Sequence, residues 1–210
     1  MIPAHGLPAI CLITSGSETE LTIVARLVEA GARWFQLRVK DQPDREVYSR
    51  GVRLRERLSG SDALFSLNDR ADIAAACGAG GLHLGQEDLD LADARRLLPK
   101  ACIGVSVHEG VEAARAAEAD YVGTGAFFTT QTKADARPLS RDRLHAVQSS
   151  FSGPIVGIGG ITPDNVDQLP PLGIRHVAIS SAVFGVDDPV GAFRAIAVTL
   201  AGPPADAAGS

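Results

Sequence analysis

The chain has 210 residues, and its 20 Lys and Arg against 25 Asp and Glu give a formal net charge of −5 at pH 7. Hydrophobic residues make up 45% of the chain and charged residues 21%, proportions that exclude a disordered or membrane-embedded protein. The negative balance argues against a nucleic-acid-binding protein, because such proteins gather Lys and Arg on one face. It does not exclude a small basic pocket for an anionic ligand.

Cysteine usage and the absence of long apolar runs predict a cytoplasmic protein. Cys11, Cys77 and Cys102 are odd in number and lack the spacing of a metal site, so we expect buried, reduced thiols. No run approaches the roughly 18 apolar residues that a membrane span needs. The N-terminal segment has Pro3 and Pro8 where a signal peptide would have its apolar core.

One pattern runs along the whole chain: a short apolar run, a polar loop and then a helical segment. The apolar runs predict eight strands, at Ala9–Ile13, Trp34–Leu37, Ala63–Leu67, Gly81–Leu84, Cys102–Val105, Tyr121–Gly123, Ile155–Ile158 and His176–Ile179. Most of them are nearly continuous in apolar or small residues, as expected for a parallel sheet that is covered on both faces.

Helical segments separate these predicted strands. From Leu21, apolar residues recur at i, i+3, i+4 and i+7, the spacing of one buried helix face. Ser17 or Thr19 is expected to cap this helix, and Gly31 to end it. Pro189 suits the first turn of the last helix.

Eight strand–helix units leave two architectures, a closed (β/α)8 barrel and a doubly wound open sheet. The short, even units favour the barrel, and no dinucleotide-binding fingerprint follows the first strand. The closest glycine cluster, Gly157-Ile-Gly159-Gly160, lies in the seventh unit and has Thr162 where the fingerprint needs its last Gly. We therefore predict an α/β protein, a single-domain (β/α)8 TIM barrel over residues 1–201, with a disordered tail over residues 202–210.

In such a barrel, the residues that follow the strands converge on one mouth, which holds the active site. Gln36, Arg38 and Lys40 follow the second strand at a spacing that points all three to one side of an extended segment. Two inward-pointing cations would be costly without a bound anion. The alternative is that they lie just beyond the strand, on a solvated loop.

Asp69 and Asp88 fall at equivalent positions after the third and fourth predicted strands. Two carboxylates in a mouth that also holds cations suit Mg²⁺, which keeps several waters and shares phosphate oxygens. Either Asp alone is equally well explained as the N-cap of the following helix. The pair, beside Arg38 and Lys40, favours the metal.

Later loops carry candidates for phosphate binding. Thr130, Thr132 and Lys133 suit an anion, although such a cluster is also ordinary loop composition. Gly160 and Ser181 end the seventh and eighth units, where barrels build phosphate sites from free backbone N–H groups; a tight turn is the alternative for the glycine. A phosphate site and a more cationic, diphosphate-sized site predict two phosphorylated small molecules, and therefore a transferase.

These motifs resemble those of the thiamine-phosphate synthase (thiamine-phosphate pyrophosphorylase) family. The matching motifs are Gln36-Leu-Arg38-Val-Lys40-Asp41, Leu67-Asn68-Asp69-Arg70, Gly81-Leu-His83-Leu-Gly85-Gln86-Glu87-Asp88, Gly104-Val-Ser106, Thr130-Gln-Thr132-Lys133 and Gly157-Ile-Gly159-Gly160-Ile161. They stand in the family's order over nearly the whole chain. The resemblance implies a (β/α)8 barrel that condenses 4-amino-2-methyl-5-hydroxymethylpyrimidine diphosphate with 4-methyl-5-hydroxyethylthiazole phosphate, giving thiamine phosphate and pyrophosphate.

The resemblance also implies roles for single residues. It implies a Mg²⁺ site at Asp69 and Asp88 with Asn68 beside them, pyrophosphate contacts at Arg38, Lys40 and Lys133, pyrimidine contacts at Gln36 and Ser106, and substrate contacts around the thiazole phosphate at Thr130, Thr132, Gly160, Ser180 and Ser181. Arg38, Lys40, Lys133 and Ser106 would be the catalytic set. The implied reaction ionises the pyrimidine CH2–O bond before the thiazole nitrogen attacks, so it needs leaving-group stabilisation and no protein base.

The chain departs from the family pattern at Cys11, Ser15, Thr129 and Ser180, which stand where the family usually has Tyr, Asp, Pro and an apolar residue. The loop over residues 134–138 is also atypical. These departures concern the pyrimidine pocket and the efficiency of the reaction, whereas the set of charged residues is complete.

Two other functions stay open. One is a thiazole tautomerase of the same superfamily, which has a Ser-Val-His segment like that ending at His108; the other is a non-catalytic barrel that binds a phosphate ligand. His108 would be an acid/base in the tautomerase and a hydrogen-bonded spectator in the synthase. The cationic set, useless without a diphosphate, favours the synthase. The expected partners are small-molecule substrates, neither nucleic acid nor membrane, and the sequence leaves homo-oligomerisation open.

Overall fold

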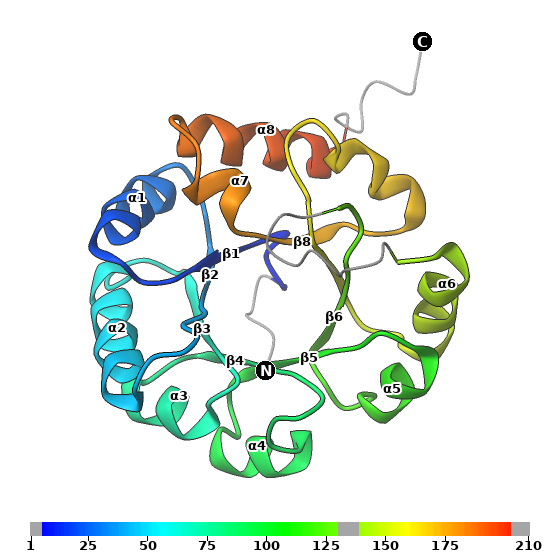
Figure 1. Cartoon of the computed structure of the whole chain (residues 1–210), viewed down its shortest axis with the longest axis horizontal. Helices are drawn as coiled ribbons and strands as arrows, with labels where there is room; N and C mark the ends of the chain where they lie inside the picture. The colour runs from blue at the N-terminus through cyan, green and yellow to red at the C-terminus, as the bar shows by residue number, and fades with distance from the viewer. Residues whose placement is uncertain (1–5, 130–138, 203–210) are drawn as a thin grey trace.

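The computed structural model describes residues 6–129 and 139–202, and it shows a closed barrel of parallel strands surrounded by helices (Figure 1). The strands pair in chain order and β8 closes on β1, so the predicted (β/α)8 barrel is confirmed. The strands are β1 Ile10–Thr14, β2 Trp34–Leu37, β3 Leu64–Asn68, β4 Gly81–Leu84, β5 Cys102–Ser106, β6 Tyr121–Gly125, β7 Ile155–Ile158 and β8 His176–Ile179. The tail predicted over residues 202–210 lies, from residue 203 on, outside the described residues.

The helices follow the strands on the outside of the barrel. They are α1 Glu18–Glu29, α2 Asp44–Arg57, α3 Ala71–Cys77, α4 Leu91–Leu97, α5 Gly110–Arg115, α6 Arg141–Ser150, α7 Ser181–Phe184 and α8 Pro189–Ala201, with 3₁₀ turns η1 Val166–Gln168 and η2 Pro170–Leu172 between β7 and β8. None of the helices in the described residues has the length and apolar character that crossing a membrane requires.

Local signals in the sequence account for the helix ends. Ser17 is the N-cap of α1, because its hydroxyl accepts from the backbone N–H of Glu20, so the alternative cap at Thr19 is excluded. Gly31 follows the helix at φ = 100°, a left-handed conformation that suits glycine. Pro189 stands in the first turn of α8, as predicted.

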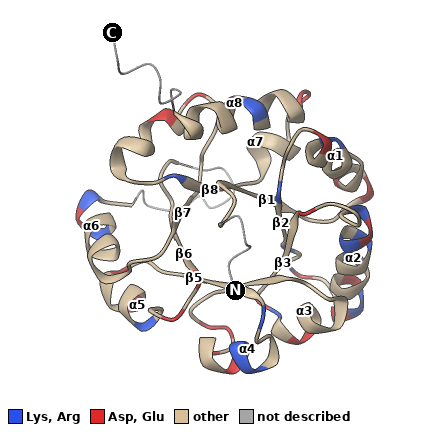
Figure 2. Ribbon diagram, turned by 180° about the vertical axis from the view of Figure 1, so that it is seen from behind, with Lys and Arg blue, Asp and Glu red and all other residues tan. Residues whose placement is uncertain are grey.

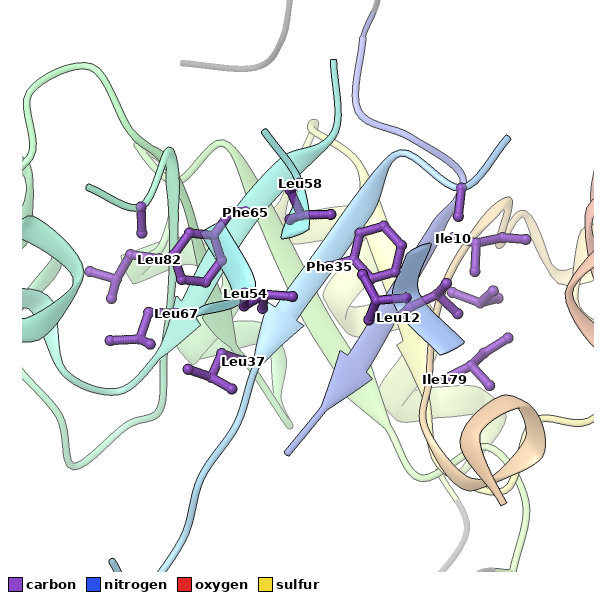
Figure 3. Close-up of a cluster of buried hydrophobic side chains, with 14 of the residues drawn as sticks. Ile10, Leu12, Phe35, Leu37, Leu54, Leu58, Phe65, Leu67, Leu82 and Ile179 are labelled. Atoms are coloured by element: carbon purple, nitrogen blue, oxygen red, sulfur yellow. The ribbon is translucent and has the colours of Figure 1, made fainter. Parts of the chain in front are cut away.

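The larger hydrophobic core lies between the barrel and its helices. Outward-facing strand residues such as Leu12, Phe35 and Leu67 are 0% exposed and pack beneath the helices. Figure 3 shows several of them together with Leu54 and Leu58 from the α2 side of the barrel. Because the helices cover one face of each strand and the barrel encloses the other, both faces are buried, and the runs read as continuously apolar.

A second core fills the barrel itself. Its buried members are Leu7, Cys11, Ile13, Trp34, Cys102, Tyr121 and Val156. The rings of Trp34 and Tyr121 meet edge to face, with centroids 5.0 Å apart. Cys11, Cys77 and Cys102 are all buried free thiols, as the sequence predicted. The barrel interior is therefore solid at this level, and ligands must bind at its mouth.

Candidate active site

The carboxyl ends of β3 and β4 bring Asp69 and Asp88 together. Asp69 directly follows β3, and its backbone N–H donates to the carbonyl of His83 on β4, at 2.8 Å. Its φ of 67° lies in the left-handed region, and the N–H of Arg70 reaches back to the carbonyl of Asn68, also at 2.8 Å. This tight turn aims the Asp69 side chain away from the end of the strand toward the next unit of the barrel.

The two carboxyl groups are within hydrogen-bond reach of each other. Partial burial and the neighbouring charge of Asp88 raise the pKa of Asp69 to about 6, while Arg38 and Asn68 act in the opposite direction. Asp88 is held in turn by the backbone N–H of Gly85, which donates to its Oδ2 at 2.6 Å. Two carboxylates that repel each other in this way make a site that a cation would stabilise.

The donor set fits Mg²⁺. Asp69 and Asp88 offer carboxylate oxygens, and Asn68 lies beside them with an amide oxygen. In the part of the chain that the structure describes, no group of three or more His, Cys, Asp or Glu side chains is placed to bind a metal. A cation here would complete its shell with waters and ligand oxygens, as Mg²⁺ commonly does.

The segment after β2 differs from the inward-pointing strand that the sequence spacing suggested. The strand ends at Leu37, so Arg38 and Lys40 lie beyond it, as in the alternative interpretation. Gln36 is inside the barrel and only 4% exposed. Arg38 is half-buried and close enough to influence the pKa values of Asp69 and His83, whereas Lys40 is exposed on the loop. Beyond Leu37, the Arg38 N–H still continues the β1–β2 ladder by donating to the carbonyl of Thr14, and the polypeptide then leaves the sheet.

Ser106, at the end of β5, is anchored from inside the barrel. Its Oγ lies 2.9 Å from His83 Nε2, and the other ring nitrogen of His83 lies 3.1 Å from the Tyr121 hydroxyl. Burial, and then the charge of Arg38, lowers the pKa of His83 to about 4, so the imidazole is neutral at physiological pH. Gln86 also donates to the Ser106 carbonyl, at 2.6 Å.

Glycines and a short helix form the opposite side of the mouth. Gly159 and Gly160 have φ values of 97° and 66°, and the Asn165 side chain donates to the carbonyl of Gly160 at 2.8 Å. A Cβ at Gly160 would lie 2.7 Å from the carbonyl oxygen of Thr129, so the glycine serves the turn as well as any ligand. The geometry shows the tight turn, and the phosphate site stays a prediction.

The two serines after β8 have different surroundings. The Ser180 hydroxyl donates to the carbonyl of Ile13 at 2.9 Å, which ties β8 to β1 at the mouth. Ser181 is exposed and begins α7, where the first backbone N–H groups have no partner within the helix. Of the two, Ser181 is the one with its hydroxyl available to a ligand.

The structure does not describe every predicted residue. Thr130, Thr132, Lys133 and the atypical loop at 134–138 lie outside the described residues. His108 is exposed, with its Nδ1 3.3 Å from Glu112 Oε2. One side of the mouth thus holds the two carboxylates with Asn68 and Arg38. Ser106 is linked to this side by its hydrogen bond to His83. Gly160 and Ser181 follow the neighbouring strands β7 and β8.

Sequence reasoning missed three supports of this site. It did not identify His83 or Tyr121, although the alternation in Gly81-Leu-His83-Leu was a signal that His83 faces inward. It also gave no role to Arg70, whose guanidinium bonds to both Asp44 and Asp72 beside the mouth. At the end of β1, the Thr14 hydroxyl and the Ser15 N–H donate to the Glu20 carboxylate of α1 at 2.5 Å and 2.6 Å, which orders the first loop without the Asp usual near Ser15.

Comparisons with known sequences identify a family. The family model described as thiamine monophosphate synthase matches residues 10–183. The thiamine-phosphate synthase of Pyrococcus furiosus is 40% identical over 171 residues, which cover 80% of this chain and 83% of the relative. That of Moorella thermoacetica is 42% identical over 183 residues, which cover 85% of this chain and 87% of the relative.

Solved structures agree with the sequence relatives. The thiamine phosphate pyrophosphorylase from Pyrococcus furiosus superposes with a TM-score of 0.80 at 34% identity, covering 91% of this chain and 94% of that one. The 3-hexulose-6-phosphate synthase from Salmonella typhimurium has a TM-score of 0.69 at 18% identity, covering 92% of this chain and 99% of that one, which reflects the shared fold alone.

Proposed function

This chain belongs to the thiamine monophosphate synthase family, and from that premise we propose that it works with Mg²⁺ held between Asp69 and Asp88. It is a thiamine-phosphate synthase, a transferase that joins the pyrimidine diphosphate to the thiazole phosphate and releases pyrophosphate. The observation that carries the metal proposal is the pair of adjacent, mutually repelling carboxylates with Arg38 beside them.

The residues of the mouth divide the work of the reaction. Bound Mg²⁺ would neutralise the charge of the diphosphate leaving group. Such neutralisation stabilises a transition state by several kcal/mol. Arg38 and Lys40 bind the same diphosphate, together with Lys133 from outside the described residues. Gln36 and Ser106 orient the pyrimidine ring so that its CH2 group faces the thiazole. No side chain is required to move a proton while the CH2–O bond breaks.

The thiazole phosphate binds on the opposite side of the mouth. Its phosphate accepts from backbone N–H groups at Gly160 and at the start of α7, and from the Ser181 hydroxyl. Thr130 and Thr132 complete this grip. Ser180 contributes by holding the loop, because its hydroxyl already donates to Ile13. This arrangement keeps the two anionic groups at opposite sides, so that each has its own set of donors.

The thiols support a proposal for the cellular setting. Three free cysteines are buried in the described chain. Because free thiols are typical of reducing compartments, they support a cytoplasmic enzyme.

Product formation tests this proposal. The two substrates are incubated with Mg²⁺ or with a chelator, and pyrophosphate and thiamine phosphate are measured together. We expect equal amounts of both products, formed only when both substrates and Mg²⁺ are present. Asp88→Asn should reduce the rate by about a hundredfold or more, whereas Asp93→Asn, which removes an exposed carboxylate of α4 that pairs with Arg96, should not. Equal turnover in the chelator would refute the metal site.

A further inference from the structure

A line of hydrogen-bonding side chains runs from the barrel interior to the mouth. Tyr121 lies in the interior, His83 is next to it, and Ser106 stands at the end of β5, partly exposed. The rings of His83 and Tyr121 are nearly parallel, with centroids 5.6 Å apart and an interplanar angle of 25°. The innermost group of this line is therefore coupled to a residue that faces the substrates.

The Tyr121 hydroxyl sets the direction of these hydrogen bonds. The residue is 2% exposed, and burial raises the pKa of its phenol, so the proton stays on oxygen. Among the described residues, His83 Nδ1 is the hydrogen-bond partner of this hydroxyl. A buried hydroxyl that left its proton unpaired would carry a desolvation cost, so Tyr121 donates and Nδ1 accepts.

The direction then passes to Ser106. A neutral imidazole has one N–H and one bare nitrogen, so an accepting Nδ1 puts the hydrogen on Nε2. The Nε2–H donates to Ser106 Oγ, 2.9 Å away. If both ring nitrogens carried a hydrogen, the Nε2–H would still donate to Ser106. With one lone pair engaged by the Nε2–H, Ser106 keeps its O–H to donate toward the mouth and one further lone pair.

We propose that Tyr121 and His83 are positioning residues that make Ser106 a hydrogen-bond donor, and that Ser106 recognises the pyrimidine through a ring-nitrogen lone pair rather than through its amino group. An amino group presents N–H donors, which would use the remaining lone pair of Ser106 and leave its O–H without an acceptor, whereas the lone pair of a ring nitrogen accepts from that O–H. The recognition step rests on the proposed function, which assigns the pyrimidine to Ser106.

The neighbouring strands leave space for this line of side chains. A Cβ at Gly104 would overlap the Tyr121 ring, and a Cβ at Gly123 would lie 3.1 Å from His83 Cε1. Neither glycine has a positive φ, so the positions require the absence of a side chain and not an unusual backbone. Packed in these gaps, the two rings are fixed in the orientation that joins the hydroxyls.

The tautomer of His83 tests the line without any substrate. In the full chain labelled with ¹⁵N-histidine, NMR should report the Nε2–H tautomer for His83, and Tyr121→Phe should convert it to a mixture. Ser66→Ala is the matched control, because it removes another interior hydroxyl, which accepts from Trp34 Nε1 at 2.8 Å, and should keep the original tautomer. A wild-type Nδ1–H tautomer, which requires no variant to detect, would overturn the proposal, as would an unchanged tautomer in Tyr121→Phe.

Substrate analogues test the recognition. Ser106→Ala should weaken binding of the pyrimidine diphosphate about fivefold, and should weaken an analogue without the amino group equally. The pyrimidine has two ring nitrogens, and each can be replaced by C–H in an analogue. For one of these two analogues, Ser106→Ala should not weaken binding. If Ser106→Ala instead leaves binding of the analogue without the amino group unchanged, the assignment to a ring nitrogen is overturned. If the parent diphosphate does not bind at all, the proposed function has failed, while the His83 tautomer still reports on the line of side chains.

Discussion

Asp69 combines an unfavourable backbone conformation with an unfavourable charge. Its φ of 67° is accessible to Asp and Asn at some cost, because their short side chains tolerate the left-handed region better than others do. Its carboxyl is also partly buried beside Asp88. Both features reduce the stability of the free protein, and both place a carboxylate oxygen where the proposed cation would need it.

The free protein should therefore be more stable when Asp69 carries no charge. The folded-state pKa of about 6 exceeds the ordinary value of 3.8, so the folded state binds the proton more tightly, and the free energy of unfolding falls as pH rises from about 4 to 6. Asp69→Asn removes this loss. After discounting for the half-exposed carboxyl, we expect a gain of about 1 kcal/mol at pH 7, or roughly 2–4 °C in Tm.

Thermal unfolding in a chelator between pH 4 and pH 7 measures this effect. The gap between Asp69→Asn and the wild type should close at pH 4, where both side chains are neutral. A gap that does not change with pH would show that the charge of Asp69 is not its origin. The same variant should lose synthase activity, because it removes a carboxylate from the proposed metal site.

His108 separates the two enzymatic interpretations of the sequence. It is exposed, its backbone N–H donates to Glu112 at 2.6 Å, and its ring faces the same carboxylate. Proton transfer by a general acid/base is worth about 10²–10⁴-fold. In the synthase no such transfer is needed, so His108→Ala should change single-turnover pyrophosphate release by less than about tenfold. Lys133→Ala should cost far more, and an equal loss in the two variants would contradict the assigned chemistry.

At the scale of elements, the strands were predictable and their connections were not. The predicted strands agree with the structure within two residues, because both faces of each strand are buried and the runs are apolar. β6 is longer than predicted, since Thr124 and Gly125 continue its ladder to β7 beyond the apolar residues. The β7–β8 connection contains two 3₁₀ turns, and α7 has only four residues. The sequence did not predict these elements, because such short turns carry no periodic pattern of apolar residues.

Candidate residues were predictable to the extent that they end strands. Asp69 and Asp88 were identified as a pair because the ends of neighbouring parallel strands converge. His83 was missed because its importance depends on what stands opposite it, which only the register of Gly104 and Gly123 with their neighbours reveals. The left-handed turn at Asp69 left no mark in the sequence beyond the residue type itself.

Arg70 joins α2 and α3 beside the turn at Asp69. Its guanidinium bonds to Asp44, the first residue of α2, and to Asp72 in the first turn of α3, and it lowers the pKa of both carboxyls. Because Arg70 directly follows Asp69, this clamp holds the turn. We expect Arg70→Ala to weaken Mg²⁺ binding by about tenfold, measured by calorimetry in the presence of pyrophosphate.

The matched control for the clamp is Arg53→Ala. Arg53 bridges Glu18 of α1 and Glu46 of α2 through a similar exposed ion pair away from Asp69. Its loss should leave the Mg²⁺ affinity unchanged, because exposed ion pairs contribute little by themselves. If both substitutions weaken Mg²⁺ binding equally, the effect is one of general stability and the clamp has no specific role.

At the scale of the whole molecule, an acidic protein binds two anionic substrates. The net charge is −5, and the charged residues are distributed widely over the outer helices and loops, as Figure 2 shows. The overall field therefore does not attract a diphosphate. We therefore expect attraction to come from Arg38 and Lys40, and from the proposed metal, which would offset Asp69 and Asp88. Binding of the metal and of the diphosphate should consequently depend on each other.

This mutual dependence is measurable as a stabilisation of the closed barrel. A ligand that binds only the folded state stabilises it by about 2.7 kcal/mol at a hundred times its Kd, which corresponds to roughly 5–10 °C in Tm for a chain of this size. We expect Mg²⁺ and pyrophosphate together to reach this range, and either alone to shift Tm by less than about 2 °C. Asp88→Asn keeps an oxygen for the Gly85 N–H but removes the charge, so it should abolish the joint shift. A full shift with pyrophosphate in a chelator would mean that the cationic side chains bind the diphosphate without a metal, and that Asp69 and Asp88 oppose binding instead of supporting it.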